Sequence, residues 1–223
     1  MKHLSILCIA SASLVWATAA VATGKSADLA VNGSIVPGAA CTVAVGTGPL
    51  DLGNIKASEL EADPSKPTKL AEQRVKTTVA CPQPQRFAFV VRETGGMDPG
   101  SETAFPMRSD DEAKGAGKLF LLFDTQSAKI DGKQGFVTGA NGVTDLGQAS
   151  WGPATSSREN LPITNGRFAV GFVTEEASMK APENIRDLSV YLLVRPQINP
   201  VEQLDLSQAI GFSSDLGLEI TYF

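Results

Sequence analysis

The feature that most constrains the fold is a series of short apolar runs with turn residues between them. The runs with the clearest strand composition, rich in aromatic and β-branched side chains, are residues 86–91, 118–123, 166–173 and 188–194. The 21 glycines and 13 prolines fall between such runs rather than in one linker. Asp131-Gly132, Asn141-Gly142 and Asn165-Gly166 favour positive φ, as tight turns require. Many short strands with turns between them predict an all-β sandwich or barrel.

Helix signals are few. Residues 56–63 favour one or two helical turns before Pro64 ends them, and residues 205–210 favour another turn. Residues 94–117 are polar and Gly-rich, which predicts a long exposed loop. None of these segments changes the all-β prediction.

The first 22 residues are typical of a signal peptide. Lys2 and His3 form a short positive region, residues 4–15 are apolar, and Ala20-Val21-Ala22 fits the cleavage pattern of small residues. The alternative is a buried N-terminal core helix. The apolar run is too short to span a bilayer, and we expect no transmembrane segment. We therefore expect an exported chain with one domain over residues 23–223.

Removal of residues 1–22 excludes several functions. It leaves 18 basic and 24 acidic residues, a formal charge of −6, and no histidine. The charge argues against a nucleic-acid surface, and a Ser-His-Asp or Cys-His site cannot form. Carboxylates gather in the predicted loop at Asp98, Glu102, Asp110, Asp111 and Glu112. Their spacing matches no calcium loop, so a solvated acidic loop is favoured. We expect no catalytic residues, metal or cofactor.

Two cysteines remain after cleavage, Cys41 and Cys81. An even pair in an exported chain predicts a disulfide, and two free buried thiols are the alternative. Closing a loop of about 40 residues would stabilise the fold by roughly 4 kcal/mol on the chain-entropy model.

The final segment alternates as a half-buried strand does. Leu216, Leu218, Ile220 and Tyr222 fall on one face, and Gly217, Glu219 and Thr221 on the other. The apolar face requires a covering partner. Either neighbours within the same sheet supply it, or the strand borders an open edge that another chain completes.

Several motifs stand at the two ends of the chain. An alternating segment with Gly33 precedes Cys41-Thr42-Val43 and Leu50-Asp51-Leu52-Gly53, Cys81 follows some forty residues later, and Tyr222 is penultimate. These motifs resemble those of chaperone–usher pilins, most closely fimbrial-like proteins sometimes called β-fimbriae. The resemblance covers residues 29–92 and 185–223. The chain departs from the family in its short N-terminal arm. It also has Ile210, with Gly211 next to it, where pilins usually carry glycine twelve residues before the tyrosine.

The resemblance implies an incomplete immunoglobulin-like (pilin-type) β-sandwich with one disulfide from strand A to strand B. It implies a structural, minor or adaptor fimbrial subunit that is completed by a donor strand. The expected partners are a periplasmic chaperone, an outer-membrane usher and neighbouring fimbrial subunits, in the periplasm and then in a cell-surface fimbrium. The expected groove residues are Ile210, Phe212, Leu216, Leu218, Ile220 and Tyr222. The candidate donor arm is Ala27, Leu29 and Val31.

Two other functions stay open from the sequence. A self-complete secreted or periplasmic sandwich could bind carbohydrate or protein through residues 94–117 and Trp151, since exposed aromatic rings stack on sugars. An enzyme built on Asp110 and Asp111 is the less favoured hypothesis.

Overall fold

The structure is a computed structural model that describes residues 40–46, 48, 50–93, 103–109, 115–142, 144–154, 163 and 166–223. All of these residues belong to one compact unit, Val36–Phe223. The expected signal peptide lies outside the described residues, so its assignment stays a prediction. In the part of the chain that is described, no helix has the length and apolar character needed to cross a membrane.

The described residues form eleven strands and two short 3-10 helices. The elements are β1 (Thr42–Val45), η1 (Ala57–Glu59), β2 (Thr68–Lys69), β3 (Gln73–Glu93), β4 (Ala104–Ser109), β5 (Gly115–Ile130), β6 (Lys133–Gln134), β7 (Phe136–Asn141), β8 (Phe168–Val173), β9 (Asn184–Ile198), η2 (Val201–Gln203), β10 (Phe212–Ser213) and β11 (Leu216–Tyr222). Every pairing between these strands is antiparallel.

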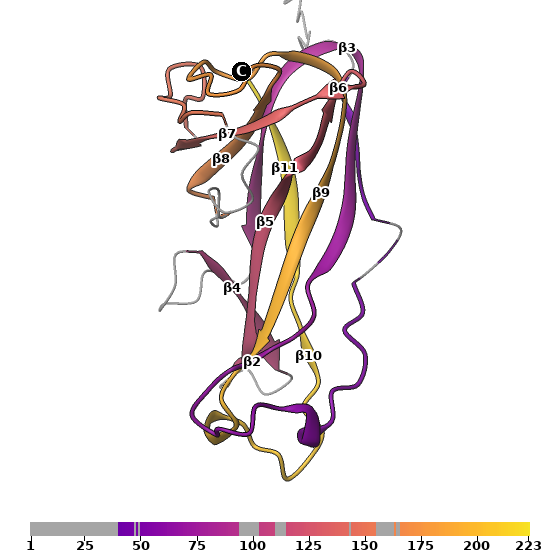
Figure 1. The fold of residues 1–223 in the computed structure, drawn as a ribbon, viewed down its shortest axis with the longest axis vertical. Coiled ribbons are helices and arrows are strands. Elements are labelled where there is room, and N and C mark those ends of the chain that lie inside the picture. Colours follow the sequence, from indigo (N-terminus) through magenta and orange to yellow (C-terminus); the bar gives the residue numbers. More distant parts are fainter. Residues whose placement is uncertain are drawn as a thin grey trace, which may run out of the picture. The chain divides into compact units, whose positions relative to one another are not determined.

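Strand β3 belongs to two layers because its two halves pair with different strands. Its first half lies between β1 and β9. Its second half pairs with β11 and meets β8 at a single residue pair, Phe89 and Val170. The first layer continues from β9 through β5 and β4 to β10, and the second continues from β8 to β7. Figure 1 shows β3 turning over at one end of the described unit between these layers.

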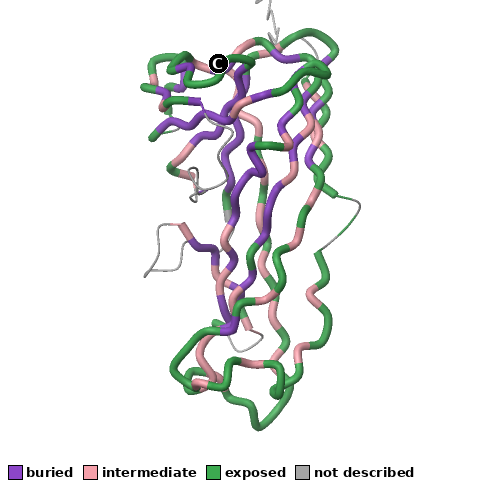
Figure 2. The backbone as a smooth tube through the Cα atoms, in the orientation of Figure 1, coloured by how far each residue is buried: buried purple, intermediate pink, exposed green. Residues whose placement is uncertain are grey.

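Phenylalanine rings fill the space between the layers. Phe89 of β3 stacks on Phe123 of β5 with ring centroids 5.4 Å apart, and Phe172 of β8 meets Phe123 edge-on at 5.6 Å. Because Phe89 and Phe172 come from the second layer and Phe123 from the first, these contacts hold the layers together. Buried residues accordingly follow the long strands in Figure 2. The all-β sandwich expected from the sequence is confirmed.

The long strands extend well beyond the apolar runs that predict them. Alternating Leu188, Val190, Leu192 and Val194 of β9 are all buried, as a period of two requires. Strand β5 continues past its apolar run through Asp124 and shifts register between Asp124 and Lys129. An irregularity of this kind lets a strand absorb residues that do not fit the alternation.

The prediction of helical turns is confirmed for one of the two expected segments and is wrong for the other. Residues 56–63 do contain a helical turn, the 3-10 helix η1. Residues 205–210 contain no helix; the Asp205 carboxylate instead accepts hydrogen bonds from the Ser207 N–H at 3.1 Å and the Ser207 hydroxyl at 2.6 Å. This local turn competes with helical hydrogen bonding.

The expected long loop at residues 94–117 is also wrong in part, because it contains strand β4. Phe105 and Met107 of β4 are buried, and the strand pairs with β5 from Ala104 to Arg108. Pro106 lacks an N–H donor and disfavours a central strand. It is accommodated here because the described partner on the other side of β4, β10, reaches only Arg108 and Ser109.

The expected turns have the positive φ angles that their glycines favour. Asp131 and Gly132 both have positive φ, 48° and 79°, between β5 and β6. Gly142 has φ 86° and Gly166 has φ 62°. These values lie in the left-handed region that glycine enters at little cost.

Phe123 provides a test of the sandwich core. We expect Phe123→Ala to lower the free energy of unfolding by about 3–5 kcal/mol, because it removes a buried ring that touches both layers. Urea denaturation followed by circular dichroism measures the change. Met179→Ala is the control: its side chain is 69% exposed, so its effect should stay within about 0.5 kcal/mol. Equal effects of the two substitutions would contradict the proposed core.

Candidate functional site

A disulfide and a tyrosine hydroxyl join three strands at one end of the unit. Cys41 and Cys81 are bonded, so the predicted disulfide is confirmed and joins the start of β1 to β3. The Cys41 N–H donates a hydrogen bond to the Tyr222 hydroxyl oxygen at 2.9 Å. The strand that begins after Cys41 and the strand that ends at Tyr222 are therefore held together at this end.

Strand β11 has one paired edge and one edge without a described partner strand. It pairs with β3 from Leu216 opposite Glu93 to Tyr222 opposite Phe87. Among the described strands, no other pairs with β11. Its even-numbered residues are half-buried while Gly217 and Glu219 are exposed. The strand thus presents a row of backbone donors and acceptors next to an apolar face.

Strand β1 and the segment after it lie opposite β11, across the groove described below. Within the described residues β1 pairs only with β3, from Thr42 opposite Ala80 to Val45 opposite Thr77. Val43 is half-buried against the core, and the segment continues through Leu50 and Leu52. The two flanks of the sandwich, β1 and β11, are both attached to β3 but are not paired with each other.

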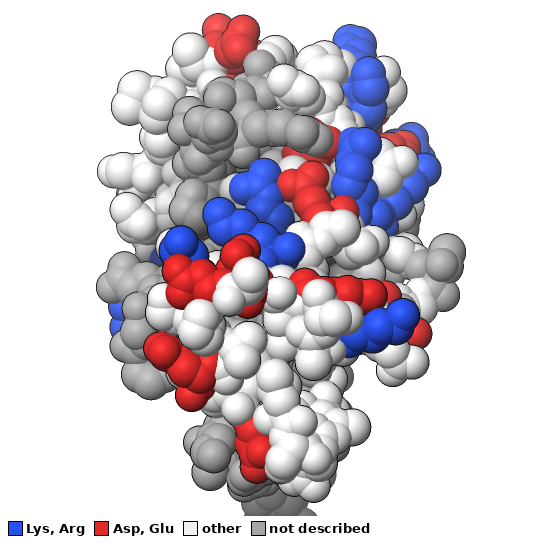
Figure 3. Space-filling view, turned by 60° about the horizontal axis from the view of Figure 1, so that its bottom comes forward, with Lys and Arg blue, Asp and Glu red and all other residues white. Residues whose placement is uncertain are grey.

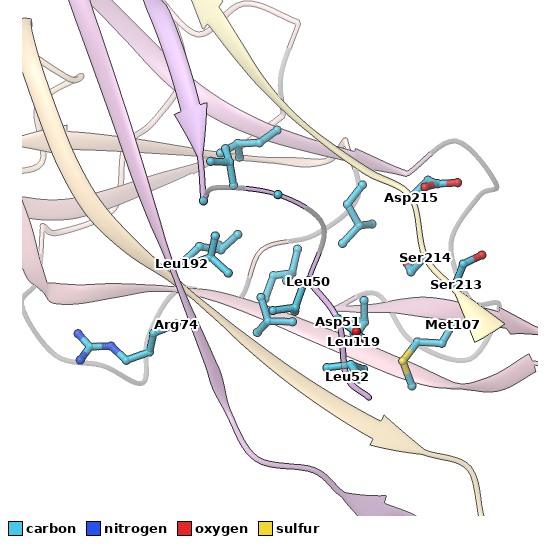
Figure 4. A pocket seen from close by; sticks show the side chains of 18 of the residues that line it. Leu50, Asp51, Leu52, Arg74, Met107, Leu119, Leu192, Ser213, Ser214 and Asp215 are labelled. Carbon is cyan, nitrogen blue, oxygen red and sulfur yellow. The ribbon is translucent and has the colours of Figure 1, made fainter. Parts of the chain in front are cut away.

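A groove of about 1140 Å³ separates these flanks. Figure 4 shows Leu50, Leu52, Leu119 and Leu192 around one space, with Ser213, Ser214 and Asp215 on the far side. The groove is lined by Val43, Val45, Gly46, Gly48, Leu50, Asp51, Leu52, Gly53, Asn54, Arg74, Val75, Lys76, Val91, Met107, Leu119, Leu121, Tyr191, Leu192, Val194, Ile210, Gly211, Phe212, Ser213, Ser214, Asp215, Leu216 and Leu218. Its floor consists of core-facing side chains, because Leu119, Leu121, Leu192 and Val194 are buried residues of the first layer.

The Arg74 side chain, one of the charged groups at the groove, points away from its floor (Figure 4). Arg74 Nη2 lies 2.6 Å from Asp124 Oδ2, and its guanidinium carbon lies 4.4 Å from the centre of the Tyr191 ring. Figure 4 shows the Arg74 side chain directed away from the leucines. The ion pair and the cation–π contact hold the guanidinium on the outer face of the sheet, away from the apolar floor of the groove.

Four of the six expected groove residues line the groove. Ile210, Phe212, Leu216 and Leu218 are on its wall. Ile220 and Tyr222 pack against the core beyond the groove, and the Tyr222 hydroxyl accepts the bond from Cys41. The groove therefore follows the first half of β11 and the segment before it. The candidate donor arm, Ala27, Leu29 and Val31, lies outside the described residues.

Sequence analysis did not identify the floor or the opposite wall. Leu50 and Leu52 were part of a family motif with no assigned contact, and Val75, Met107 and Leu192 belong to other strands. Alternation along residues 188–194 indicates that Leu192 faces inward, but it does not indicate whether the inward side is covered.

Trp151 is not an exposed binding residue. It is 4% exposed, its Nε1–H donates to the Leu146 carbonyl at 3.3 Å, and its ring stacks on Phe223 at 5.8 Å. It packs with Ala88 and Val90 on the outer face of the second layer. The sugar-stacking role considered for Trp151 is thus wrong. The acidic residues Asp98, Glu102, Asp110, Asp111 and Glu112 lie outside the described residues.

The described residues contain no group of three His, Cys, Asp or Glu side chains placed to hold a metal ion. Comparison of the chain with protein-family models and with curated proteins finds no match to either. The groove and its strand edge are therefore the features from which a function is argued.

The hydrogen bond between Cys41 and Tyr222 is testable by a one-atom change. Tyr222→Phe removes the acceptor and leaves the ring, so we expect a loss of about 0.5–1.5 kcal/mol of local stability. Amide hydrogen exchange at Cys41 should accelerate about two- to tenfold as a result. Met179→Ala, an exposed change outside β1, β3 and β11, should leave that rate unchanged. An unchanged rate in Tyr222→Phe would show that the bond does not hold this end.

Proposed function

We propose that the protein is a structural, minor or adaptor subunit of a chaperone–usher fimbria, assembled when a strand from another chain fills the groove beside β11. One observation carries the proposal: β11 has an edge without a described partner and borders a groove of about 1140 Å³ whose floor is apolar. The motifs that resemble pilins, at Cys41, Cys81 and Tyr222, support the same function.

Main-chain and side-chain contacts both favour an extended segment as the occupant. The backbone of β11 offers a ladder of hydrogen bonds, which fixes the register of an added strand. The groove accepts alternate side chains of that strand, because β-strand side chains point to opposite faces. Each large apolar side chain that becomes buried contributes about 1.5–3 kcal/mol. Several such side chains make a long-lived joint, whereas an uncovered edge promotes aggregation.

The N-terminal arm of a neighbouring copy is the proposed donor. Ala27, Leu29 and Val31 alternate with polar or small residues, and Ile35 continues the pattern after Gly33. A periplasmic chaperone would supply a strand to the groove before assembly, and an outer-membrane usher would release the subunits into the cell-surface fimbrium. In this proposal the protein works through its groove and its disulfide rather than through catalysis.

A peptide of residues 23–36 tests the donor assignment. We expect it to bind a chain that starts at Val36, the first residue of the compact unit, and to raise its thermal midpoint. A peptide of the same composition, reordered so that the apolar residues no longer alternate, should have no effect. Equal stabilisation by both peptides would contradict strand addition.

Adjacent residues of β11 provide a matched pair of variants. Leu218 lines the groove, and Glu219 points to the opposite face. We expect Leu218→Gln to weaken peptide binding about tenfold or more, because it removes an apolar contact worth about 1.5–3 kcal/mol. Glu219→Gln should bind the peptide as the parent does. Isothermal titration calorimetry measures both affinities, and equal weakening would place the peptide elsewhere.

A further inference from the structure

A second cavity, of about 430 Å³, lies at the end of the unit where η1 and η2 are found (Figure 1). Its floor is made by Ala116 of β5 and Ile198 of β9, which are both buried. Its walls come from two segments, residues 55–60 and 204–212. Such a volume falls in the range of about 300–1,000 Å³ that is typical of ligand pockets. We refer to it as the base pocket.

The side chains that line the base pocket are nearly all apolar. They are Ile55, Ala57, Leu60, Ala116, Ile198, Leu204, Leu206, Ala209, Ile210 and Phe212, together with the uncharged Ser207 and Gln208. Figure 3, in which this end of the unit comes forward, shows acidic and basic side chains next to each other beside uncharged surface. The surrounding charges are therefore mixed, and it is the lining that favours an apolar group as the occupant.

Four large apolar side chains are exposed in the part of the chain that is described, and three of them lie at a cavity. Val45 and Leu50 line the groove, and Leu206 lines the base pocket. The fourth, Met179, is the most exposed at 69% and lines neither cavity. Methionine is enriched at protein interfaces, and its flexible side chain fills irregular apolar spaces. Met179 thus has the character of an interface anchor.

The loop that carries Met179 is held by hydrogen bonds on one side. The Ala177 N–H donates to the Ala154 carbonyl, and the Ala154 N–H donates to the Ser178 carbonyl, both at 2.8 Å. Ala177 has φ 56°, a left-handed conformation that alanine adopts only where its surroundings enforce it. Ser178, next to Met179, is buried. The loop therefore presents Met179 already ordered, which reduces the entropy that binding would cost.

Met179 and the base pocket lie at opposite ends of β9, which runs along the described unit in Figure 1. Met179 comes five residues before Asn184, where the strand begins, and Ile198, where the strand ends, is in the floor of the pocket. The 15 residues of β9 span about 50 Å, whereas five residues reach at most about 18 Å. Met179 therefore cannot enter the base pocket of its own chain, but it can enter that of a second copy.

We propose that copies of this chain associate head to tail, with Met179 of one copy inserted into the base pocket of the next, where it contacts Leu60 and Leu204. The anchor and its pocket are different surfaces, so the contact is heterologous and leaves one free anchor and one free pocket on each pair of copies. Contacts of this kind repeat from copy to copy and generate filaments or rings. The inference does not depend on strand addition at β11, because it uses neither that strand nor the groove.

NMR on mixed copies tests the contact in the full exported chain with its disulfide intact. The labelled copy carries Met179→Gln, so it offers a pocket without an anchor. The unlabelled copy carries Leu206→Glu, so it offers an anchor and has a charged pocket mouth. We expect the methyl resonances of Leu60, Leu204 and Leu206 in the labelled copy to shift as the unlabelled copy is added to about 1 mM, a concentration suited to weak contacts.

Variants of the unlabelled copy test the anchor itself. Adding Met179→Leu keeps a large apolar side chain, so the shifts should persist. Adding Met179→Gln, which is polar and of similar size, should weaken the contact about tenfold or more, because apolar burial is lost. Neither change should affect folding, since residue 179 is exposed.

Three results would overturn the proposal. The first is an equal effect of the two Met179 variants, and the second is a labelled pocket that does not shift when copies with Met179 are added. The third is a set of shifts confined to groove residues such as Leu192, because the added copies would then bind through strand addition alone.

Discussion

The structure depends on the main-chain pairing of β3 in both layers. One strand supplies hydrogen bonds to β1 and β9 in its first half and to β11 in its second half. The turn of β3 between these halves starts at the disulfide, since Cys81 follows the last residue paired with β1. The two flanks of the sandwich are therefore positioned by a single continuous strand, and the space between them is determined by where that strand turns.

The groove follows from this arrangement and from the core. Its floor is the inner face of the first layer, which the second layer covers at the rings of Phe89, Phe123 and Phe172 but leaves open beside β11. An uncovered part of a hydrophobic core exposes apolar surface that favours association. The same residues, such as Leu119 and Leu192, thus belong to the core on one side and line the groove on the other.

Local patterns predicted much of the fold, and contacts between distant segments account for most of what was missed. The runs at residues 86–91 and 188–194 lie within β3 and β9, because their composition and alternation are properties of neighbouring residues. Strand β4 was missed because the polar, Gly-rich composition of residues 94–117 predicts a loop, whereas the strand forms through its pairing with β5. Alternation predicted the apolar face of β11, and the resemblance to pilins implied that this face is one wall of a groove. The other wall and the floor come from residues as far apart as Leu50 and Leu192, and no periodicity relates them.

The two walls of the groove are held in different ways, which affects how easily each wall moves. The wall that follows β1 is bonded covalently at Cys41, and its described main-chain pairing with β3 stops at the bond from the Gly46 N–H to the Lys76 carbonyl. Beyond this point Leu52 is held by side-chain packing rather than by a ladder. Segments held in this way open at lower free energy than paired strands do. The wall that follows β1 is consequently anchored at the disulfide, and we expect it to move away from β11 most easily at its other end.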